Sequence, residues 1–232
     1  MKKNSRNTAF FITGTGTGVG KTFAAACLAH FFIGKGLKTG VVKPVQTGTE
    51  NGDDDMAMIK KAVQDISPLS IPDCIYRFRL PASPHLAAKA EKTRIDPLGI
   101  LSVITKIREE ENLDILLVEG AGGLYVPICE NFMMIDLISI LKMPAVLVCD
   151  SGLGTINHTL LSIKALKANK IKCAGFILNK CSENPGMIEK DNLEILKKNA
   201  GVPFLGTIKN AADEIEIDTG IYSFHGFSAI TD

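Results

Sequence analysis

Short apolar runs alternate with longer segments of mixed polarity along most of the chain. The apolar runs predict buried strands, and they lie at 8–13, 39–45, 115–118, 145–149, 173–178 and 202–208. The segments between them carry apolar residues at helical spacing and predict helices at 20–35, 56–63, 85–91, 96–111, 135–141, 155–168 and 187–199. Residues 66–84 contain four prolines and are expected to be irregular, and the tail after residue 208 gives no clear pattern.

This alternation predicts an α/β fold, in which a mostly parallel central sheet carries helices on both faces. No linker, internal repeat or low-complexity segment interrupts the chain, so we expect a single domain over residues 1–232. Pro44 is expected to stop the second strand, because proline has no N–H to donate to a neighbouring strand. Asp96 and Pro97 are typical of the cap and first turn of a helix.

The turn between the first strand and the first helix is rich in glycine and ends in Gly-Lys-Thr. In a phosphate-binding loop, glycines let backbone N–H groups converge, and the following helix adds its positive end. Lys21 would reach the outer phosphates, and Thr22 would hold Mg²⁺. Gly14 and Gly20 enclose five residues, where the strict pattern has about four. A glycine-rich turn with a solvated lysine is the alternative; the order of strand, loop and helix favours nucleotide binding.

Further candidates lie at the carboxyl ends of predicted strands, where ligands of parallel sheets bind. Glu119 directly follows the run 115–118 and is a candidate metal-side carboxylate, with a solvated turn residue as the alternative. Lys43 is a candidate second cation for phosphoryl oxygens, and without a site around it would be an ordinary solvated lysine. Asn179 and the loop after residue 149 occupy equivalent positions.

Three consecutive aspartates at 53–55 precede the second predicted helix. Mg²⁺ prefers carboxylate and hydroxyl oxygens, so Asp55 is a candidate ligand beside Thr22 and Glu119. Asp53 and Asp54 are equally acidic, and the pattern leaves the choice among the three open. A solvated acidic turn is the alternative for the whole group.

Charge and composition restrict the kinds of partner and cellular compartment that we expect for this chain. The chain carries 26 Lys and Arg against 25 Asp and Glu, so no global field favours nucleic acid or an anionic membrane. The six cysteines form no CxxC pair and are interpreted as buried reduced thiols. No apolar stretch has the length of a membrane span or forms a signal peptide, and we expect a cytoplasmic protein. His85 and His158 are expected to be structural.

Together these segments resemble the dethiobiotin synthetases, ATP-dependent ligases of the biotin pathway within the phosphate-loop NTPase superfamily. The loop at 14–22 fits the family's approximate pattern G-T-[DG]-T-x-V-G-K-T. The other matching blocks are Lys-Pro-Val-Gln-Thr-Gly at 43–48, Ser-Pro-His at 83–85, Val-Glu-Gly-Ala-Gly-Gly at 118–123 and Gly-Leu-Gly-Thr-Ile-Asn-His at 152–158. The resemblance extends from residue 12 to about 179 and implies the phosphate-loop NTPase type of fold.

The resemblance implies that ATP drives the closure of a ureido ring. 7,8-Diaminopelargonate takes up CO₂ as a carbamate, ATP phosphorylates the carbamate to a carbamic-phosphoric anhydride, and the neighbouring amine closes the ring. The products are dethiobiotin, ADP and phosphate. The resemblance also implies Mg²⁺ and a homodimer, in which the segment 154–157 of one chain binds the substrate carboxylate at the other chain's site.

Site residues are carried over position by position, on the strength of the resemblance. Lys21 and Lys43 resemble the catalytic lysines, and Thr22, Asp55 and Glu119 resemble the Mg²⁺ ligands. The implied nucleotide-binding residues are Gly16, Thr17, Gly18, Val19, Gly20, Lys21, Thr22, Phe23, Asp55, Glu119 and Asn179, the last resembling the residue that contacts adenine. The implied substrate-binding residues are Thr17, Lys43, Thr47, Gly122, Gly154, Thr155, Ile156 and Asn157.

Three positions depart from the family pattern, and three other classes compete with it. Gly16 and Gly18 replace acids common in the family, and Lys209 replaces a proline, so base selectivity is open. Partition and septum-placement ATPases carry a signature lysine at the position of Gly16, which is missing here. Cobyrinate-type amide synthetases usually add a glutaminase domain, for which 232 residues leave no room. The retained site lysines and Glu119 argue against a non-catalytic nucleotide-binding module.

Overall fold

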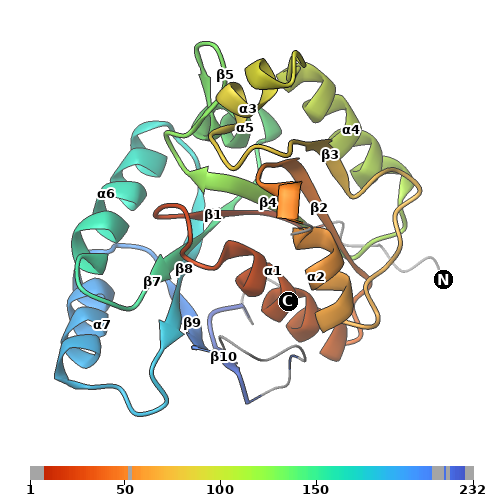
Figure 1. The fold of residues 1–232 in the computed structure, drawn as a ribbon. Helices are drawn as coiled ribbons and strands as arrows, with labels where there is room; N and C mark the ends of the chain where they lie inside the picture. The colour runs from red at the N-terminus through yellow and green to blue at the C-terminus, as the bar shows by residue number, and fades with distance from the viewer. Residues whose placement is uncertain (1–7, 52–53, 211–216, 218–219, 228–232) are drawn as a thin grey trace.

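The computed structural model describes all residues except 1–7, 52–53, 211–216, 218–219 and 228–232. Its core is an eight-stranded sheet with the order β10-β9-β8-β7-β1-β4-β2-β3 (Figure 1). The strands are β1 (Thr8–Gly14), β2 (Thr39–Gln46), β3 (Cys74–Arg77), β4 (Ile115–Gly123), β7 (Ala145–Asp150), β8 (Cys173–Cys181), β9 (Phe204–Lys209) and β10 (Tyr222–Phe224). All neighbours pair in parallel except β9 and β10, so the predicted mostly parallel α/β sheet is confirmed.

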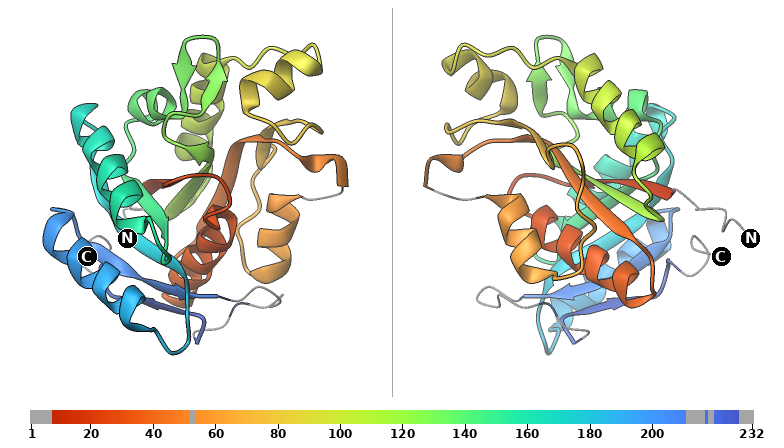
Figure 2. Two further views of the ribbon diagram at one scale, coloured as in Figure 1. Left: turned by 60° about the vertical axis from the view of Figure 1, so that its left-hand side comes forward. Right: turned by 90° about the vertical axis from the view of Figure 1, so that its right-hand side faces the viewer.

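Helices cover both faces of this sheet (Figures 1 and 2). They are α1 (Lys21–Gly34), α2 (Asp55–Ala62), α3 (Pro84–Ala90), α4 (Pro97–Glu110), α5 (Met134–Leu141), α6 (Thr155–Ala168) and α7 (Met187–Asn199), joined by a 3₁₀ turn (Thr49–Asn51) and the hairpin of β5 (Pro127–Cys129) and β6 (Phe132–Met133). Phe10 and Ile12 pack with α1 and α2, whereas Phe11 packs with α4 and α5. Side chains alternate between faces along a strand, so β1 joins two hydrophobic layers at the centre of the molecule.

The second strand continues past Pro44, contrary to the prediction. β2 pairs with β4 from Thr39 to Val42 and with β3 from Lys43 to Gln46. Pro44 therefore lies just after the strand changes its hydrogen-bonded partner. The missing N–H of proline is tolerated at this point, so β2 continues to Gln46. Lys43, directly before Pro44, is thereby held in the interior of the protein.

Two short strands of the central sheet lie where the sequence predicted none, as do β5 and β6 of the hairpin. β3 lies inside the proline-rich stretch 66–84, so the expectation of an irregular segment is wrong at Cys74–Arg77. β10 lies in the tail and pairs antiparallel with β9. Both strands are at the edges of the sheet and have three or four residues, too few to display an apolar period.

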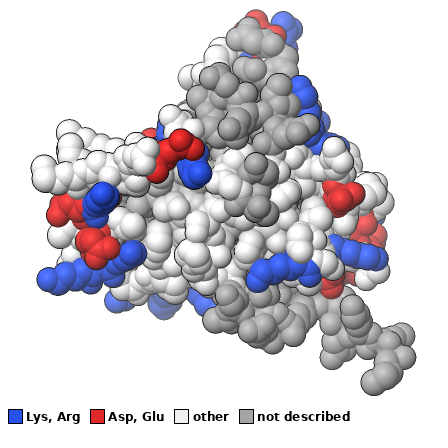
Figure 3. All heavy atoms as spheres, turned by 90° about the horizontal axis from the view of Figure 1, so that it is seen from below, with Lys and Arg blue, Asp and Glu red and all other residues white. Residues whose placement is uncertain are grey.

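Within the described residues, no helix combines the length and the hydropathy that a membrane span requires. On the face shown in Figure 3, basic and acidic side chains are interspersed. All six cysteines are free, and Cys27, Cys74, Cys149 and Cys181 are buried. Burial raises the pKa of the Cys149 thiol to about 12, so this thiol remains protonated at neutral pH.

Candidate functional site

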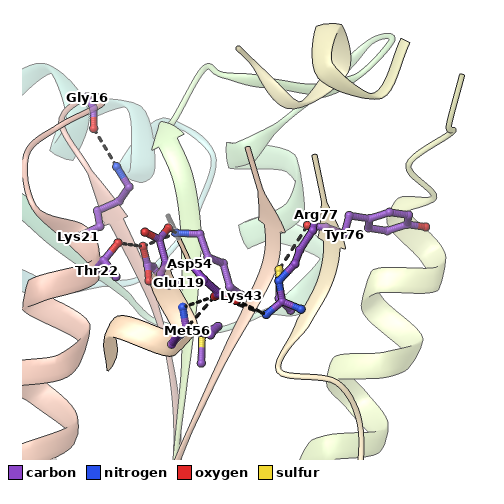
Figure 4. Close-up of polar contacts among 12 residues, drawn as sticks. Gly16, Lys21, Thr22, Lys43, Asp54, Met56, Tyr76, Arg77 and Glu119 are labelled. Carbon is purple, nitrogen blue, oxygen red and sulfur yellow. Dashed lines mark hydrogen bonds and ion pairs between the residues drawn. The ribbon is translucent and has the colours of Figure 1, made fainter. Parts of the chain in front are cut away.

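The glycine-rich loop leaves β1 at the centre of the sheet and leads directly into α1. Gly18 and Gly20 have φ values of 74° and 82°, in the left-handed region that favours glycine. Lys21 begins α1, and its Nζ donates to the carbonyl oxygen of Gly16 at 2.9 Å (Figure 4). Phe23 packs against the core below α1. The loop thus closes around its own lysine at the positive end of a helix.

Lys21 is poorly solvated, with only 8% of the residue exposed. This burial lowers the pKa of Lys21 to about 8, although the carboxylate of Glu119 acts in the opposite direction. The charged ammonium is therefore held less favourably than in water. A bound phosphate group would favour the charged form by supplying the negative charge that the loop itself lacks.

Glu119 is the centre of a polar cluster in the middle of β4, which continues to Gly123, so the prediction that Glu119 directly follows the strand is wrong. The residue is fully buried, so it is not a solvated turn carboxylate. Its Oε1 accepts hydrogen bonds from Thr22 Oγ1 at 2.8 Å and from Lys43 Nζ at 2.6 Å (Figure 4). Its Oε2 is buried without a hydrogen-bond partner. Such an oxygen is costly unless a cation or a donor occupies the site in the working protein.

Lys43 is a buried ammonium held between two carboxylates. It is 4% exposed, and its Nζ forms ion pairs with Glu119 and Asp55. Burial by itself would lower the pKa of Lys43, but the two carboxylates outweigh burial and raise it. The pair with Asp55 also joins β2 to the first residue of α2. Lys43 is therefore a fixed positive charge inside the cluster rather than a solvated lysine.

In the structure, two of the three consecutive aspartates make different contacts. Asp55 pairs with Lys43, whereas Asp54 caps α2 by accepting from the backbone N–H groups of Met56 at 2.9 Å and Ala57 at 3.2 Å. Arg77 on β3 also contacts Asp54, with Nη2 3.3 Å from Oδ2 (Figure 4). Asp53 lies outside the described residues. The cap role of Asp54 leaves Asp55 as the described aspartate that faces the cluster.

Asn179, at the end of β8, contacts the glycine-rich loop itself. Its Nδ2 donates to the carbonyl oxygens of Val19 at 2.9 Å and Gly20 at 3.4 Å. A Cβ at Gly20 would lie 2.0 Å from this nitrogen, so the contact also requires glycine there. The Oδ1 of Asn179 is buried without a hydrogen-bond partner. One side of the amide therefore holds the loop, and the other remains available to a ligand that donates.

A groove of about 640 Å³ runs beside the loop, between the segment after β4 and α6. Its lining includes Thr17, Tyr125 and Leu161. Gly122 precedes this segment with φ 65°, and a Cβ there would lie 2.5 Å from a methyl group of Val126. Thr47, in contrast, is half-buried beyond the other end of the cluster, after β2.

The segment 154–157 begins α6 and lies apart from the charged cluster. Thr155 is buried, and its Oγ1 donates to the Asp150 carbonyl oxygen and lies 3.4 Å from Thr159 Oγ1. Ile156 is half-buried and Asn157 is exposed. In the part of the chain that the structure describes, no hydrogen bond or ion pair joins this segment to Lys21, Lys43 or Glu119. The hydroxyl of Thr155 therefore links the start of α6 to the end of β7.

Sequence patterns did not indicate Arg77 or Tyr125. Arg77 lies on an edge strand that the sequence did not predict, and Tyr125 lies in a loop between two paired segments. Each of these residues comes close to the site only because of the order of the strands in the sheet. Strand order leaves no local pattern in the sequence. Asp54 carried a usable signal, because an aspartate directly before a helical segment is a preferred N-cap.

The mostly parallel sheet, the glycine-rich loop before α1 and the buried acid in the middle of β4 define a phosphate-loop NTPase fold. A family model described as an AAA domain matches residues 8–215. The fold also resembles a solved structure of chloroplast FtsY from Physcomitrella patens, with a TM-score of 0.60 and 16% identity, over 100% of this chain and 65% of that one.

Curated relatives define the family more closely. The ATP-dependent dethiobiotin synthetase of Anoxybacillus flavithermus is 35% identical over 205 residues, which cover 86% of this chain and 90% of the relative. The enzyme of the same name from Halalkalibacterium halodurans is 38% identical over 212 residues, covering 88% and 85%. The chain belongs to the family of ATP-dependent dethiobiotin synthetases, and the resemblance inferred from its motifs is confirmed.

Proposed function

We propose that this protein catalyses the ATP-dependent conversion of 7,8-diaminopelargonate and CO₂ to dethiobiotin. One amine of the substrate bonds to CO₂ and loses a proton to give a carbamate. A carbamate oxygen attacks the γ-phosphorus of ATP, which gives the carbamic-phosphoric anhydride and ADP. The second amine then attacks the carbonyl carbon and expels phosphate. The observation that supports this chemistry best is the buried cluster of Lys43, Glu119, Asp55 and Thr22 beside the phosphate loop.

The two lysines have different parts in this proposal. Lys21 would turn from the Gly16 carbonyl oxygen to the outer phosphates of ATP, since its Nζ already lies inside the loop. Lys43 would contact the carbamate and the transferred phosphoryl oxygens. Because its pKa is raised by Glu119 and Asp55, it stays charged and stabilises developing negative charge rather than accepting a proton. Both residues position and stabilise; neither forms a covalent intermediate.

The donor set around Glu119 fits Mg²⁺. Thr22 Oγ1, the Asp55 carboxylate and the unpartnered Oε2 of Glu119 are hard oxygen donors of the kind that this ion prefers. The described residues contain no cluster of three or more His, Cys, Asp or Glu that would hold a metal alone. Nucleotide phosphates would therefore complete the coordination. When bound, the ion would supply positive charge to the phosphate oxygens.

The loop from Gly16 to Phe23 would bind the phosphates through its N–H groups. We infer that Asn179 adjoins the base, because its unpartnered Oδ1 can accept a hydrogen bond from the exocyclic amine of adenine. The groove lined by Thr17 would take the carbon chain of the diamine, with Gly122 allowing close approach and Thr47 near the amine end.

The carboxylate of the substrate is far from its two amines, and we propose that a second copy of the chain binds it. In the described residues, no hydrogen bond or ion pair joins Gly154, Thr155, Ile156 or Asn157 to the charged cluster of their own chain. Around the groove and this segment, large apolar side chains are exposed: Leu153 at 95%, Tyr125 at 64% and Leu161 at 56%. Their burial in a homodimer would bring the start of α6 to the partner's site and offer N–H groups to the carboxylate.

A single assay tests the proposed function. Purified protein is incubated with ATP and Mg²⁺, and ADP release is measured with and without diaminopelargonate and bicarbonate, while mass spectrometry follows dethiobiotin. ADP release is expected only when both substrates are present, in equal amount to the ring-closed product. ADP release that ignores both substrates would instead indicate a switch ATPase.

A further inference from the structure

Helix α7 packs alongside α6 and carries a buried amide that the proposed chemistry does not use (Figures 1 and 2). Asn192, on α7, is 6% exposed. Its Nδ2 donates to the carbonyl oxygens of Ser151 at 3.1 Å and Gly152 at 3.4 Å. Both carbonyls belong to the loop between β7 and α6, directly before the segment 154–157. Because both hydrogen bonds of this buried amide go to the same loop, Asn192 holds that loop in place.

A second residue of α7 extends the same network. Glu189 lies three residues before Asn192, on the same side of the helix. Its Oε1 accepts from Ser151 Oγ at 3.2 Å and from the Ser182 backbone N–H at 3.0 Å. Ser151 Oγ also lies 2.9 Å from the carbonyl oxygen of Lys180 and can donate to it. The loop after β7 and the loop after β8 are therefore fastened to one helix and to each other.

The start of α6 has no support of its own from a capping side chain. Its N-cap is Gly154, with φ 93° and no side-chain hydrogen bond to the first turn. A helix N-terminus attracts an anion only where its N–H groups point, and a glycine cap adds no side chain that helps to fix that direction. Asp150 holds this loop from the end of β7, through Thr155 Oγ1 and the Gly152 N–H, and the hydrogen bonds from α7 add a constraint from outside the helix.

We propose that Asn192, assisted by Glu189, is a positioning residue for the substrate carboxylate. It fixes the loop before Gly154 and so aims the N–H groups of α6. This inference rests on the proposed function and adds to it two residues that touch neither substrate nor nucleotide.

The test compares Asn192→Leu, which keeps the size of the side chain but removes the donor, with the control Asn199→Leu. Asn199 is an exposed asparagine of the same helix, and its side-chain amide donates to the Ile195 carbonyl oxygen. For Asn192→Leu we expect the KM for diaminopelargonate to rise about tenfold, while the Kd for ATP changes less than about twofold. A KM equal to that of the control would overturn the proposal.

A second substrate separates positioning from general loosening of the fold. A diamine of the same chain length without the carboxylate cannot use the start of α6. Asn192→Leu and the parent should therefore have the same KM for this compound, to within about twofold. The tenfold rise in KM that we expect for diaminopelargonate should be absent. An equal rise in KM for both diamines would show a merely structural role and refute the inference.

Glu189→Ala keeps the proposal testable if Asn192→Leu does not fold. It should raise the KM for diaminopelargonate in the same selective way, whereas Glu194→Ala, on the exposed side of α7, should not. Kinetics of Glu189→Ala that match Glu194→Ala would contradict the network. A parent protein that forms no dethiobiotin would overturn the proposed function, and the inference with it; an active parent with unaffected variants overturns the inference alone.

Discussion

The Nζ of Lys43 lies 2.6 Å from Oε1 of Glu119, and the two residues are 4% and 0% exposed. Neither charge is stable in the interior without the other, because removing one partner leaves an uncompensated buried charge. The half-buried carboxylate of Asp55 also pairs with the Lys43 ammonium. This arrangement keeps a positive charge at a fixed place next to the phosphate loop.

Asp55→Asn and Glu119→Gln should each raise the Mg²⁺ concentration needed for half-maximal rate, by about tenfold or more, because each removes a charged oxygen donor from the proposed metal site. Asp54→Asn is the matched control, since asparagine retains the cap of α2 and Asp54 pairs with Arg77, whereas Asp55 pairs with Lys43. The measurement is a Mg²⁺ titration of ADP release. Equal shifts for Asp54→Asn and Asp55→Asn would remove Asp55 from the proposed metal site.

Lys21→Ala should reduce turnover by about a hundredfold to a thousandfold and leave the fold intact, because it removes the ammonium proposed to contact the phosphates of ATP. The control is Lys106→Ala on α4, an exposed lysine that pairs with Glu110. Turnover is measured beside circular dichroism and thermal unfolding. A folded Lys21→Ala protein with parental turnover would contradict the phosphate-loop assignment.

The ligand-free protein should become more stable towards alkaline pH because of Lys21. The pKa of Lys21 is about 8 in the folded chain against 10.5 unfolded, so the unfolded state binds more protons between these values and unfolding free energy rises with pH. Below pH 8 both states are protonated and the burial penalty is fully present. Relative to Lys21→Met, the parent should gain roughly 3 kcal/mol from pH 8 to 10.5 in urea unfolding. Parallel pH profiles of the two proteins would disprove the lowered pKa.

Two inactive variants should restore activity when mixed, if the site is shared between subunits. Lys43→Ala removes the positive charge that is proposed to lie beside the amines of the substrate. Asn157→Asp places a negative charge at the start of α6 to repel the substrate carboxylate. Exchange of subunits yields dimers in which one site carries both lesions and the other neither, so part of the activity returns. Tagged chains report the exchange. A mixture that exchanges subunits but stays inactive would place the complete site within one chain.

Patterns along the chain were sufficient to predict most of the central elements. β1, β4, β7 and β8 are apolar because helices cover both of their faces, so their composition indicates burial directly. The glycine-rich loop was predictable for a related reason. The left-handed φ values at Gly18 and Gly20 restrict the residue type, so the conformation is visible in the sequence.

Only the tertiary structure decided how the candidates combine. Thr22 and Glu119 are 97 positions apart, Lys43 and Glu119 are 76 apart, and Asn179 contacts Val19 across 160 positions. These contacts depend on the strand order, which places β4 between β1 and β2 and carries β2 past Pro44 to its second partner, β3.

The physical reason for this division is the range of the forces. Helical periodicity, turn conformation and strand burial act over a few neighbouring residues, and the amino-acid sequence by itself determined these features. The choice of Asp55 over Asp54, the loop contact of Asn179 and the network of Glu189 and Asn192 require side chains of separate elements to meet in a buried place. Burial makes each unpaired polar group costly, so the packed fold alone determined which partner each group found.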